Sequence, residues 1–394
     1  MKNSLPAAGY IFFMLTTPAA GQQPVARFFY DTQGKVTRQE RDANGDGKMD
    51  RWIHYGRGDQ VERVEQDENF DGKADVVAYY DKGRIHKQTV SSKRDGRFDI
   101  TYIYNGQGQI ERKEQDANGD GKPEAVLFYE DGRMVRSEED TNGDGRSDRI
   151  NYFSGETVAR VEEDTTGAGK INQVSFFANG QLVRKEISRK APGKVDLWGY
   201  YQEGRLLRQE EDLNGDGRPD RIVHFRGEEI VRREEDSLGQ GRLDLIESYA
   251  QGKLVSRLKD AKGSGRFDTL QVFRDGQLVR EERDTNGDGY FDIRNWYEKD
   301  LISRQEADTN HDRKVDVWVR YEGGERVIQE EDSTFNGRID ARYFFKGDQV
   351  VNQERVEEVE PAAASEPFLA VQEQTETVSR AAAKQRAEIL SQVP

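Results

Sequence analysis

The sequence predicts an all-β fold: an elongated, twisted or coiled antiparallel sheet of about thirteen 24-residue β-hairpin repeats joined by calcium loops. Three observations support this prediction. A loop of the form D-x-N-x-D-G-x-x-D returns at a nearly constant step, an aromatic residue follows it at a fixed distance, and a tight turn follows the aromatic residue. The 394 residues are 34% hydrophobic and 34% charged, which is too polar for one thick core and favours a thin repeat architecture.

We number each repeat from the first residue of its loop. The step between loops is 24 residues, with 25 at the first and third steps, where the turn is one residue longer. The loops begin at Asp42, Asp67, Ser91, Asp116, Asp140, Asp164, Ser188, Asp212, Asp236, Asp260, Asp284, Asp308 and Asp332.

After each loop, the pattern predicts two short strands around a hairpin turn. Position 14 is aromatic in all thirteen repeats, as at Tyr129 and Phe153, and position 19 is aliphatic or Met in twelve. Between them lie turns such as Glu130 to Gly132, in which Asp-Gly supplies the positive φ angles of a two-residue hairpin. The Asp-Gly turns favour hairpins over the alternative, a parallel β-solenoid with one coil per repeat.

Placing the turn at positions 16 and 17 predicts that position 14 pairs with 19, 13 with 20 and 11 with 22. Positions 21 and 23, mostly Arg and Glu, would then share the face of positions 14 and 19. Positions 11, 13 and 20 would form the opposite, more apolar face. We expect this second face to be buried by coiling of the sheet.

The ends of the chain differ from the repeats. Residues 1–21 are predicted to be a signal peptide, because Lys2 precedes a short apolar run and small residues follow it. The array is predicted over 22–356, an Ala- and Pro-rich linker over 357–367 and a helical tail over 368–394. The sequence therefore predicts a secreted or periplasmic bacterial protein, and the tail is a candidate for oligomerisation, with a frayed, solvated tail as the alternative.

Composition excludes several functions. There is no cysteine, so disulfides and thiolate chemistry are excluded. A net charge of -15 predicts no nucleic-acid binding, and no apolar run is long enough to predict a membrane span. The four histidines stand at unrelated positions and no catalytic motif is present, so we expect no enzyme activity.

Seven loops keep an oxygen-bearing side chain at positions 1, 3, 5 and 9. Hard oxygen ligands at alternate positions, with glycine at position 6, are what Ca²⁺ requires of a loop, whereas Mg²⁺ prefers a tighter octahedron that keeps its waters. The predicted ligands are Asp42, Asn44, Asp46, Asp50, Asp67, Asn69, Asp71, Asp75, Asp116, Asn118, Asp120, Glu124, Asp140, Asn142, Asp144, Asp148, Asp212, Asn214, Asp216, Asp220, Asp284, Asn286, Asp288, Asp292, Asp308, Asn310, Asp312 and Asp316. The Asp308 loop departs most, with His311 at position 4 and Arg313 in place of the glycine.

The other six loops have lost ligands and are predicted to fold as plain turns. Ala168 replaces the ligand at position 5 of one loop, and Lys190 and Lys262 stand at position 3 of two others. Asp, Asn and Gly are turn residues in their own right, so turns without metal are the alternative for all thirteen loops. Seven loops that each gather up to three carboxylates would be self-repulsive without a cation, and we therefore expect about seven Ca²⁺ sites.

The loop resembles the calcium loop of EF-hands, and more closely the loops between strands in FG-GAP and VCBS-type repeats, because strands flank it. Position 12 carries no glutamate (Leu127, Asn151 and Val223 stand there), so the resemblance implies weak calcium affinity. The hairpin halves are similar to MORN-like repeats, whose hairpins stack into elongated sheets. The resemblance covers residues 27–356.

The function expected from the sequence is that of a secreted, calcium-binding structural or adhesive repeat protein in which Ca²⁺ rigidifies the hairpin array. One alternative is a recognition module that binds a glycan or peptide through the position-14 aromatic residues. Another is a MORN-like antitoxin or immunity-type protein. The partner would be an unidentified protein or glycan at the cell surface or in the periplasm.

Overall fold

The computed structural model describes residues 25–359. The predicted signal peptide, the helical tail and residues 360–367 of the predicted linker lie outside the described residues. Residues 357–359, which we expected to open the linker, belong to the last strand.

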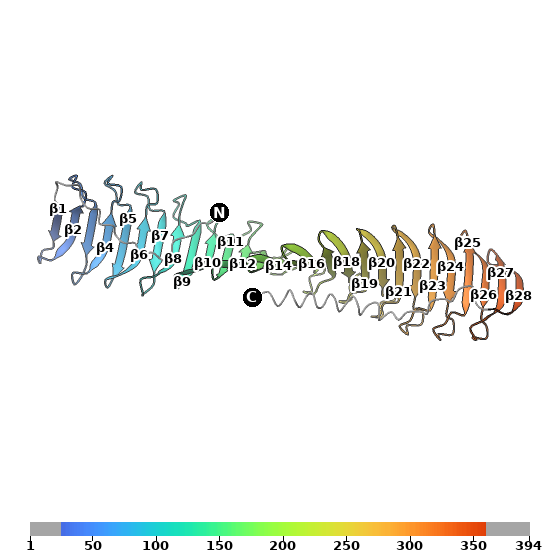
Figure 1. Cartoon of the computed structure of the whole chain (residues 1–394). Coiled ribbons are helices and arrows are strands. Elements are labelled where there is room, and N and C mark those ends of the chain that lie inside the picture. Colours follow the sequence, from blue (N-terminus) through green and yellow to red (C-terminus); the bar gives the residue numbers. More distant parts are fainter. Residues whose placement is uncertain (1–24, 360–394) are drawn as a thin grey trace. The chain divides into compact units, whose positions relative to one another are not determined.

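All regular elements of the described chain are strands, and all 28 belong to one antiparallel sheet. The chain divides into two compact units, residues 1–180 and 181–394. Within each unit every strand pairs antiparallel with the next strand along the chain (Figure 1). The all-β antiparallel prediction is therefore confirmed, and the parallel solenoid is excluded.

The first unit contains β1 (Val25–Tyr30), β2 (Val36–Asp42), β3 (Arg51–Tyr55), β4 (Val61–Gln66), β5 (Val76–Asp81), β6 (Arg84–Val90), β7 (Ile100–Tyr104), β8 (Ile110–Gln115), β9 (Ala125–Glu130), β10 (Arg133–Glu139), β11 (Arg149–Ser154), β12 (Thr157–Glu163) and β13 (Gln173–Ala178). The second unit contains β14 (Gln181–Ile187), β15 (Leu197–Gln202), β16 (Arg205–Glu211), β17 (Arg221–Arg226), β18 (Glu229–Glu235), β19 (Leu245–Ala250), β20 (Lys253–Lys259), β21 (Thr269–Arg274), β22 (Gln277–Arg283), β23 (Ile293–Glu298), β24 (Leu301–Ala307), β25 (Val317–Glu322), β26 (Glu325–Glu331), β27 (Ile339–Lys346) and β28 (Gln349–Val359).

The hairpin register is correct next to the turn and wrong beyond it. In the β11–β12 hairpin Phe153 pairs with Val158, which is the predicted pair of positions 14 and 19. The register then shifts, and Tyr152 pairs with Arg160 rather than with position 20. A β-bulge leaves one residue of the second strand without a partner, which adds local twist. The same shift recurs in β19–β20, between Ser248 and Tyr249.

The bulge changes which residues share a face. Positions 21 and 23 lie opposite positions 13 and 11, so the Arg and Glu side chains share the face of positions 11 and 13 instead of the face of position 14. Within single strands these Arg and Glu residues form ion pairs, such as Arg63–Glu65 at 2.6 Å and Arg208–Glu210 at 2.7 Å. The guanidinium group of Arg136 also stacks 4.8 Å from the ring centre of Phe128 at position 13.

Burial is concentrated near the loop ends of the strands rather than spread over one face. In the second unit a buried cluster joins positions 8, 11 and 23 of successive repeats. Its most buried member is Phe291, a position-8 side chain that is only 1% exposed. The cluster consists of Ile246, Leu258, Leu270, Phe291, Val315, Trp318 and Ile339. The expected burial of position 11 holds in this cluster, whereas position 13 is half-buried in most repeats.

Candidate metal centres

The loops connect the second strand of one hairpin to the first strand of the next. In the Asp42 loop a backbone hydrogen bond closes the base: the amide of Asp50 donates to the carbonyl of Arg41 at 2.9 Å, which draws positions 1 and 9 together. The amide of Asp67, which begins the next loop, donates across the hairpin to the carbonyl of Asp50 at 2.8 Å. The carboxylates of positions 1 and 9 are among the most buried groups of the loop, with Asp42 1% and Asp50 3% exposed.

Inside the loop, the acidic and amide side chains accept hydrogen bonds from the backbone in a fixed order. Asp42 accepts the amides of Gly45 and Gly47 at 2.5 and 2.8 Å. The side-chain oxygen of Asn44 accepts the amide of Asp46 at 2.8 Å. These short-range bonds from backbone amides to Asp and Asn oxygens curl the backbone of the loop.

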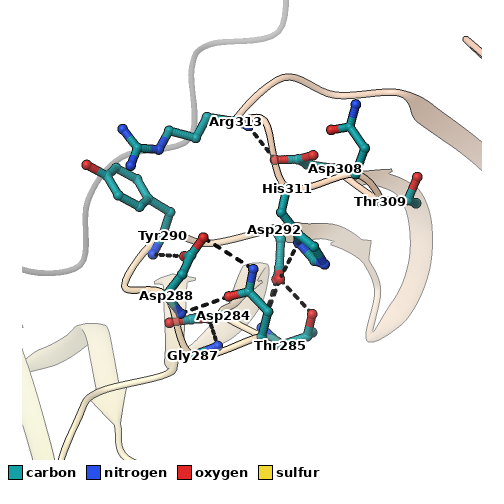
Figure 2. A network of polar contacts seen from close by, with 12 residues as sticks. Asp284, Thr285, Gly287, Asp288, Tyr290, Asp292, Asp308, Thr309, His311 and Arg313 are labelled. Carbon is teal, nitrogen blue, oxygen red and sulfur yellow. Dashed lines mark hydrogen bonds and ion pairs between the residues drawn. The ribbon is translucent and has the colours of Figure 1, made fainter. Parts of the chain in front are cut away.

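The same order of bonds recurs in the Asp284 loop between β22 and β23, which Figure 2 shows from close by. Asp284 accepts the amide of Gly287 at 2.6 Å, and Asp288 accepts the amide of Tyr290 at 2.9 Å. Asp292, at position 9, closes the loop by accepting the amide of Thr285 at 2.8 Å.

Two of the seven predicted loops bring three carboxylates together as a metal site requires. Asp42, Asp46 and Asp50 each offer an oxygen within 4.8 Å of the others, and so do Asp116, Asp120 and Glu124. These two sets are the only groups of three acidic, His or Cys ligands that lie so close among residues 25–359. The oxygen donors and their count suit a hard divalent cation.

In two of the other five loops, the side-chain amide at position 3 donates a hydrogen bond to the carboxylate at position 9. Asn142 donates its amide nitrogen to Asp148 at 2.8 Å, and Asn214 donates in the same way to Asp220 at 2.8 Å. A rotation of the amide would exchange this donor for the oxygen that a cation needs. The residues predicted as ligands therefore lie in the expected loops, but the structure brings their carboxylates together fully in only two.

The Asp308 loop differs from the others in its backbone and in its contacts. His311 and Arg313 stand where glycine is usual and adopt positive φ angles of 62° and 72°. Their side chains turn back to the preceding loop. The His311 imidazole lies 3.5 Å from the carboxylate of Asp292, and the Arg313 guanidinium lies 3.6 Å from the ring centre of Tyr290 (Figure 2).

Some degenerate loops carry a basic side chain that contacts a loop oxygen, and the sequence prediction did not include these contacts. Lys190 at position 3 donates to the carbonyl oxygen of Asp212 in the next loop at 3.1 Å. Arg189 contacts Asp196 of its own loop at 3.1 Å. The sequence signal was present, because a lysine stands where a ligand has been lost, but the reach from one loop to the next depends on the stacking of the hairpins.

The pKa shifts of a few loop carboxylates differ between loops with a full ligand sequence and degenerate loops. In the complete Asp42 loop, burial raises the pKa of Asp50, and repulsion from the neighbouring carboxylates adds to this effect. Burial likewise raises the pKa of Asp316 in the Asp308 loop, with Asp308 contributing.

In two degenerate loops the pKa shift has the opposite sign. The Thr166 hydroxyl lowers the pKa of Asp164. At Asp196 burial alone would raise the pKa, but hydrogen bonds and charge from Arg189 outweigh it and lower the pKa. Compared with an ordinary aspartate, ionisation is therefore less favourable for Asp50 and Asp316 and more favourable for Asp164 and Asp196.

Comparisons with known proteins give no family. No protein-family model matches the chain. No curated protein matches it either. Among solved structures, similarity is found to the crystal structure of TcdB2-TccC3-Cdc42, with 12% identity over 83% of this chain and 24% of that chain and a TM-score of 0.16. The chain thus spans about a quarter of the length of that structure. Similarity is also found to the crystal structure of TcdB2-TccC3 without its hypervariable C-terminal region, with 13% identity over 82% of this chain and 23% of that chain and a TM-score of 0.16.

A third similar structure is a porin-like protein from Bacteroides uniformis ATCC 8492, with 9% identity over 61% of this chain and 86% of that chain and a TM-score of 0.11. TM-scores of this size do not define a common fold. Over residues 25–359 there is no helix that could cross a membrane.

Proposed function

We propose that this protein is a calcium-binding structural repeat protein in which Ca²⁺ ions fix the joints between successive β-hairpins. The observation that carries the proposal is the convergence of Asp42, Asp46 and Asp50 within 4.8 Å, repeated by Asp116, Asp120 and Glu124. A divalent cation at these centres would relieve the repulsion that disfavours ionised Asp50.

Two degenerate loops show how a carboxylate is compensated by the chain itself. The Thr166 hydroxyl donates to Asp164, and the Arg189 guanidinium lies 3.1 Å from Asp196. In the Asp42 and Asp116 loops three carboxylates face one another, and a bound ion would supply the positive charge there.

Weak sites would suffice for a structural role. Extracellular calcium modules bind with dissociation constants of about 10⁻⁴ to 10⁻³ M. At roughly millimolar Ca²⁺ each site stabilises the fold by about 0.4 to 1.4 kcal/mol. If all seven loops that keep the ligand sequence bound an ion, together they would contribute roughly 3 to 10 kcal/mol, which is comparable with the whole stability of a domain.

The test is calorimetric titration of the metal-free protein with Ca²⁺ and with Mg²⁺, together with thermal melts in Ca²⁺ and in EDTA. We expect Ca²⁺ binding and a higher melting temperature in Ca²⁺. Asp46→Ala and Asp120→Ala should each remove one site, whereas Asp81→Ala, in a hairpin turn outside the loops, should remove none. Absence of heat and an unchanged melt in both conditions would refute the proposal.

Secretion is a separate part of the proposal, and it has its own test. Cleavage after residue 21 would leave β1 close to the mature N-terminus, because β1 begins at Val25. Export from a bacterial host should yield a protein whose N-terminus starts near residue 22. A cytoplasmic product that retains Met1 would contradict export.

The contacts of two tyrosines at position 14 favour a packing role for these residues over glycan binding. Tyr55 and Tyr104 are half-buried, and their hydroxyls donate to Gln39 and Gln88 at 3.1 and 2.7 Å. Burial raises the pKa of Tyr104 to about 12, with the neighbouring hydroxyls of Tyr102 and Tyr80 contributing. Hydroxyls that are already bonded inside the sheet are poorly placed to bind a sugar. No observation on the described residues favours the antitoxin alternative.

A further inference from the structure

The first strand, β1, has the sequence VARFFY and only one charged residue. It pairs with β2 on one side and has no described strand on the other. Phe28 is 48% exposed and Tyr30 is 60% exposed, whereas the aromatic residues at positions 12 to 14 of later hairpins are half-buried or buried. An apolar edge with unpaired backbone groups is a template for another strand.

At the other end, β28 offers the matching edge. It pairs with β27 on one side, and Val351 is 60% exposed. In all internal joints a second strand such as β26 is followed by a first strand such as β27, with position 23 opposite position 11. Among residues 25–359, β28 is a second strand with no first strand after it, and β1 is a first strand with no second strand before it.

We propose that β28 of one copy of the chain pairs antiparallel with β1 of a second copy, in the register of the internal joints. The pairing of β1 with β2 assigns repeat positions to β1. Phe29 pairs with Arg38 and Arg27 pairs with Glu40, as position 13 pairs with 21 and position 11 with 23 in the other hairpins. Phe29 therefore corresponds to position 13 and Arg27 to position 11. The joint then sets Glu354 of one copy opposite Arg27 of the next, and Gln353 opposite Phe28.

Charge complementarity supports this occupant over an unrelated strand. Two internal joints also have Arg at position 11, and each places it beside the Glu at position 23 of the preceding strand. Arg342 lies 2.6 Å from Glu330, and Arg294 lies 3.6 Å from Glu282. Arg27 is the corresponding residue of β1, and Glu354 is the corresponding glutamate of β28.

Backbone geometry indicates which amides of β1 are free. In interior hairpins the first residue of a loop donates its amide to the carbonyl of position 9 across the hairpin, as Asp67 does to Asp50 at 2.8 Å. Since the C=O and N–H groups of one peptide point in opposite directions and strand groups alternate, the amides of positions 10 and 12 face the preceding hairpin. In β1 these are Ala26 and Phe28, so a proline at Ala26 removes an outward donor and leaves the bonds to β2 in place.

The inference does not depend on calcium, because neither edge strand belongs to a loop. The test is sedimentation of the full chain across protein concentrations, with and without EDTA. We expect the mass to rise with concentration in whole multiples of the chain. Ala26→Pro should shift the distribution to single chains, and Ala26→Ser should not. Circular dichroism and melting would verify that both variants fold.

Charge exchange tests the register independently of the proline. Arg27→Glu and Glu354→Arg should each weaken assembly several-fold, because like charges then meet at every joint. An equimolar mixture of the two variants, and the Arg27→Glu/Glu354→Arg double variant, should restore it. A wild-type chain that stays single at all concentrations would overturn the proposal. This holds for any cause, including an edge of β1 that is covered by another part of the same chain. Assembly that the exchange leaves unchanged would overturn the register.

Discussion

The ammonium nitrogen of Lys262 lies 3.0 Å from the carbonyl oxygen of Asp284 and 2.9 Å from that of Thr285. Lys262 stands at position 3 of a degenerate loop, and Asp284 begins the next, complete loop. A permanent positive charge therefore lies at the rim of a predicted calcium site. The ammonium group of Lys190 contacts the carbonyl oxygen of Asp212 in the same way, so this contact between neighbouring loops occurs at least twice.

Lys262→Met is predicted to raise the calcium affinity of the Asp284 loop. Removing the ammonium group removes its repulsion of the incoming ion, and an exposed charge at this distance corresponds to about 0.3 to 1 kcal/mol, or roughly twofold to fivefold in affinity. The metal-free melting temperature should fall, because two hydrogen bonds are lost. Calorimetric titration measures the first effect and thermal melting the second. Lys253→Met, at the end of a hairpin turn, is the matched control; weaker calcium binding by Lys262→Met would contradict the prediction.

Phe291→Ala is predicted to be among the most destabilising single changes in the second unit. Phe291 is the most buried member of the cluster, at 1% exposed, and truncating a buried Phe costs about 3 to 5 kcal/mol through lost burial and the cavity that remains. Phe335→Ala is the control, since Phe335 is 49% exposed in a loop. Urea unfolding should separate the two variants clearly. Equal losses of stability would show that the cluster does not stabilise the unit.

Glu234 is predicted to make stability depend on acid pH. Burial alone would raise its pKa, but the hydrogen bond from His224 and the charge and hydrogen bond of Arg232 outweigh burial and lower the pKa to about 2. Because the folded-state pKa is depressed, this stabilisation is present above the ordinary pKa of 4.5 and is lost as the pH falls toward about 2. The difference corresponds to roughly 3 kcal/mol at neutral pH.

The measurement is the free energy of unfolding from pH 7 down to pH 2 for the wild type, Glu234→Gln and the exposed control Glu229→Gln. Glu234→Gln should be less stable at neutral pH and should lose less stability on acidification than the wild type. Parallel curves for Glu234→Gln and the wild type would exclude the ion network of Glu234 as the source of the acid dependence.

The predicted ligands lie in the loops where the sequence places them, and their carboxylates converge in only two of the seven loops. The spacing of Asp42, Asn44, Asp46 and Asp50 identifies the loop, because each side chain captures a backbone amide only a few residues away. Whether three carboxylates then converge depends on side-chain choices such as the amide of Asn142, which turns toward Asp148. The loop pattern alone does not set that choice.

The sequence by itself determined the all-β class, the alternation of hairpin and loop, and the pairing of positions 14 and 19 next to the turn. These features depend on local rules: Asp-Gly turns, alternating side chains and short-range hydrogen bonds to Asp and Asn. The tertiary structure decided the remainder. A bulge shifted Tyr152 opposite Arg160 and so moved the Arg–Glu pairs to the face of position 11. Stacking of one hairpin on the next placed Lys262 at the rim of another loop, because contacts between residues more than twenty positions apart exist only after the strands have paired.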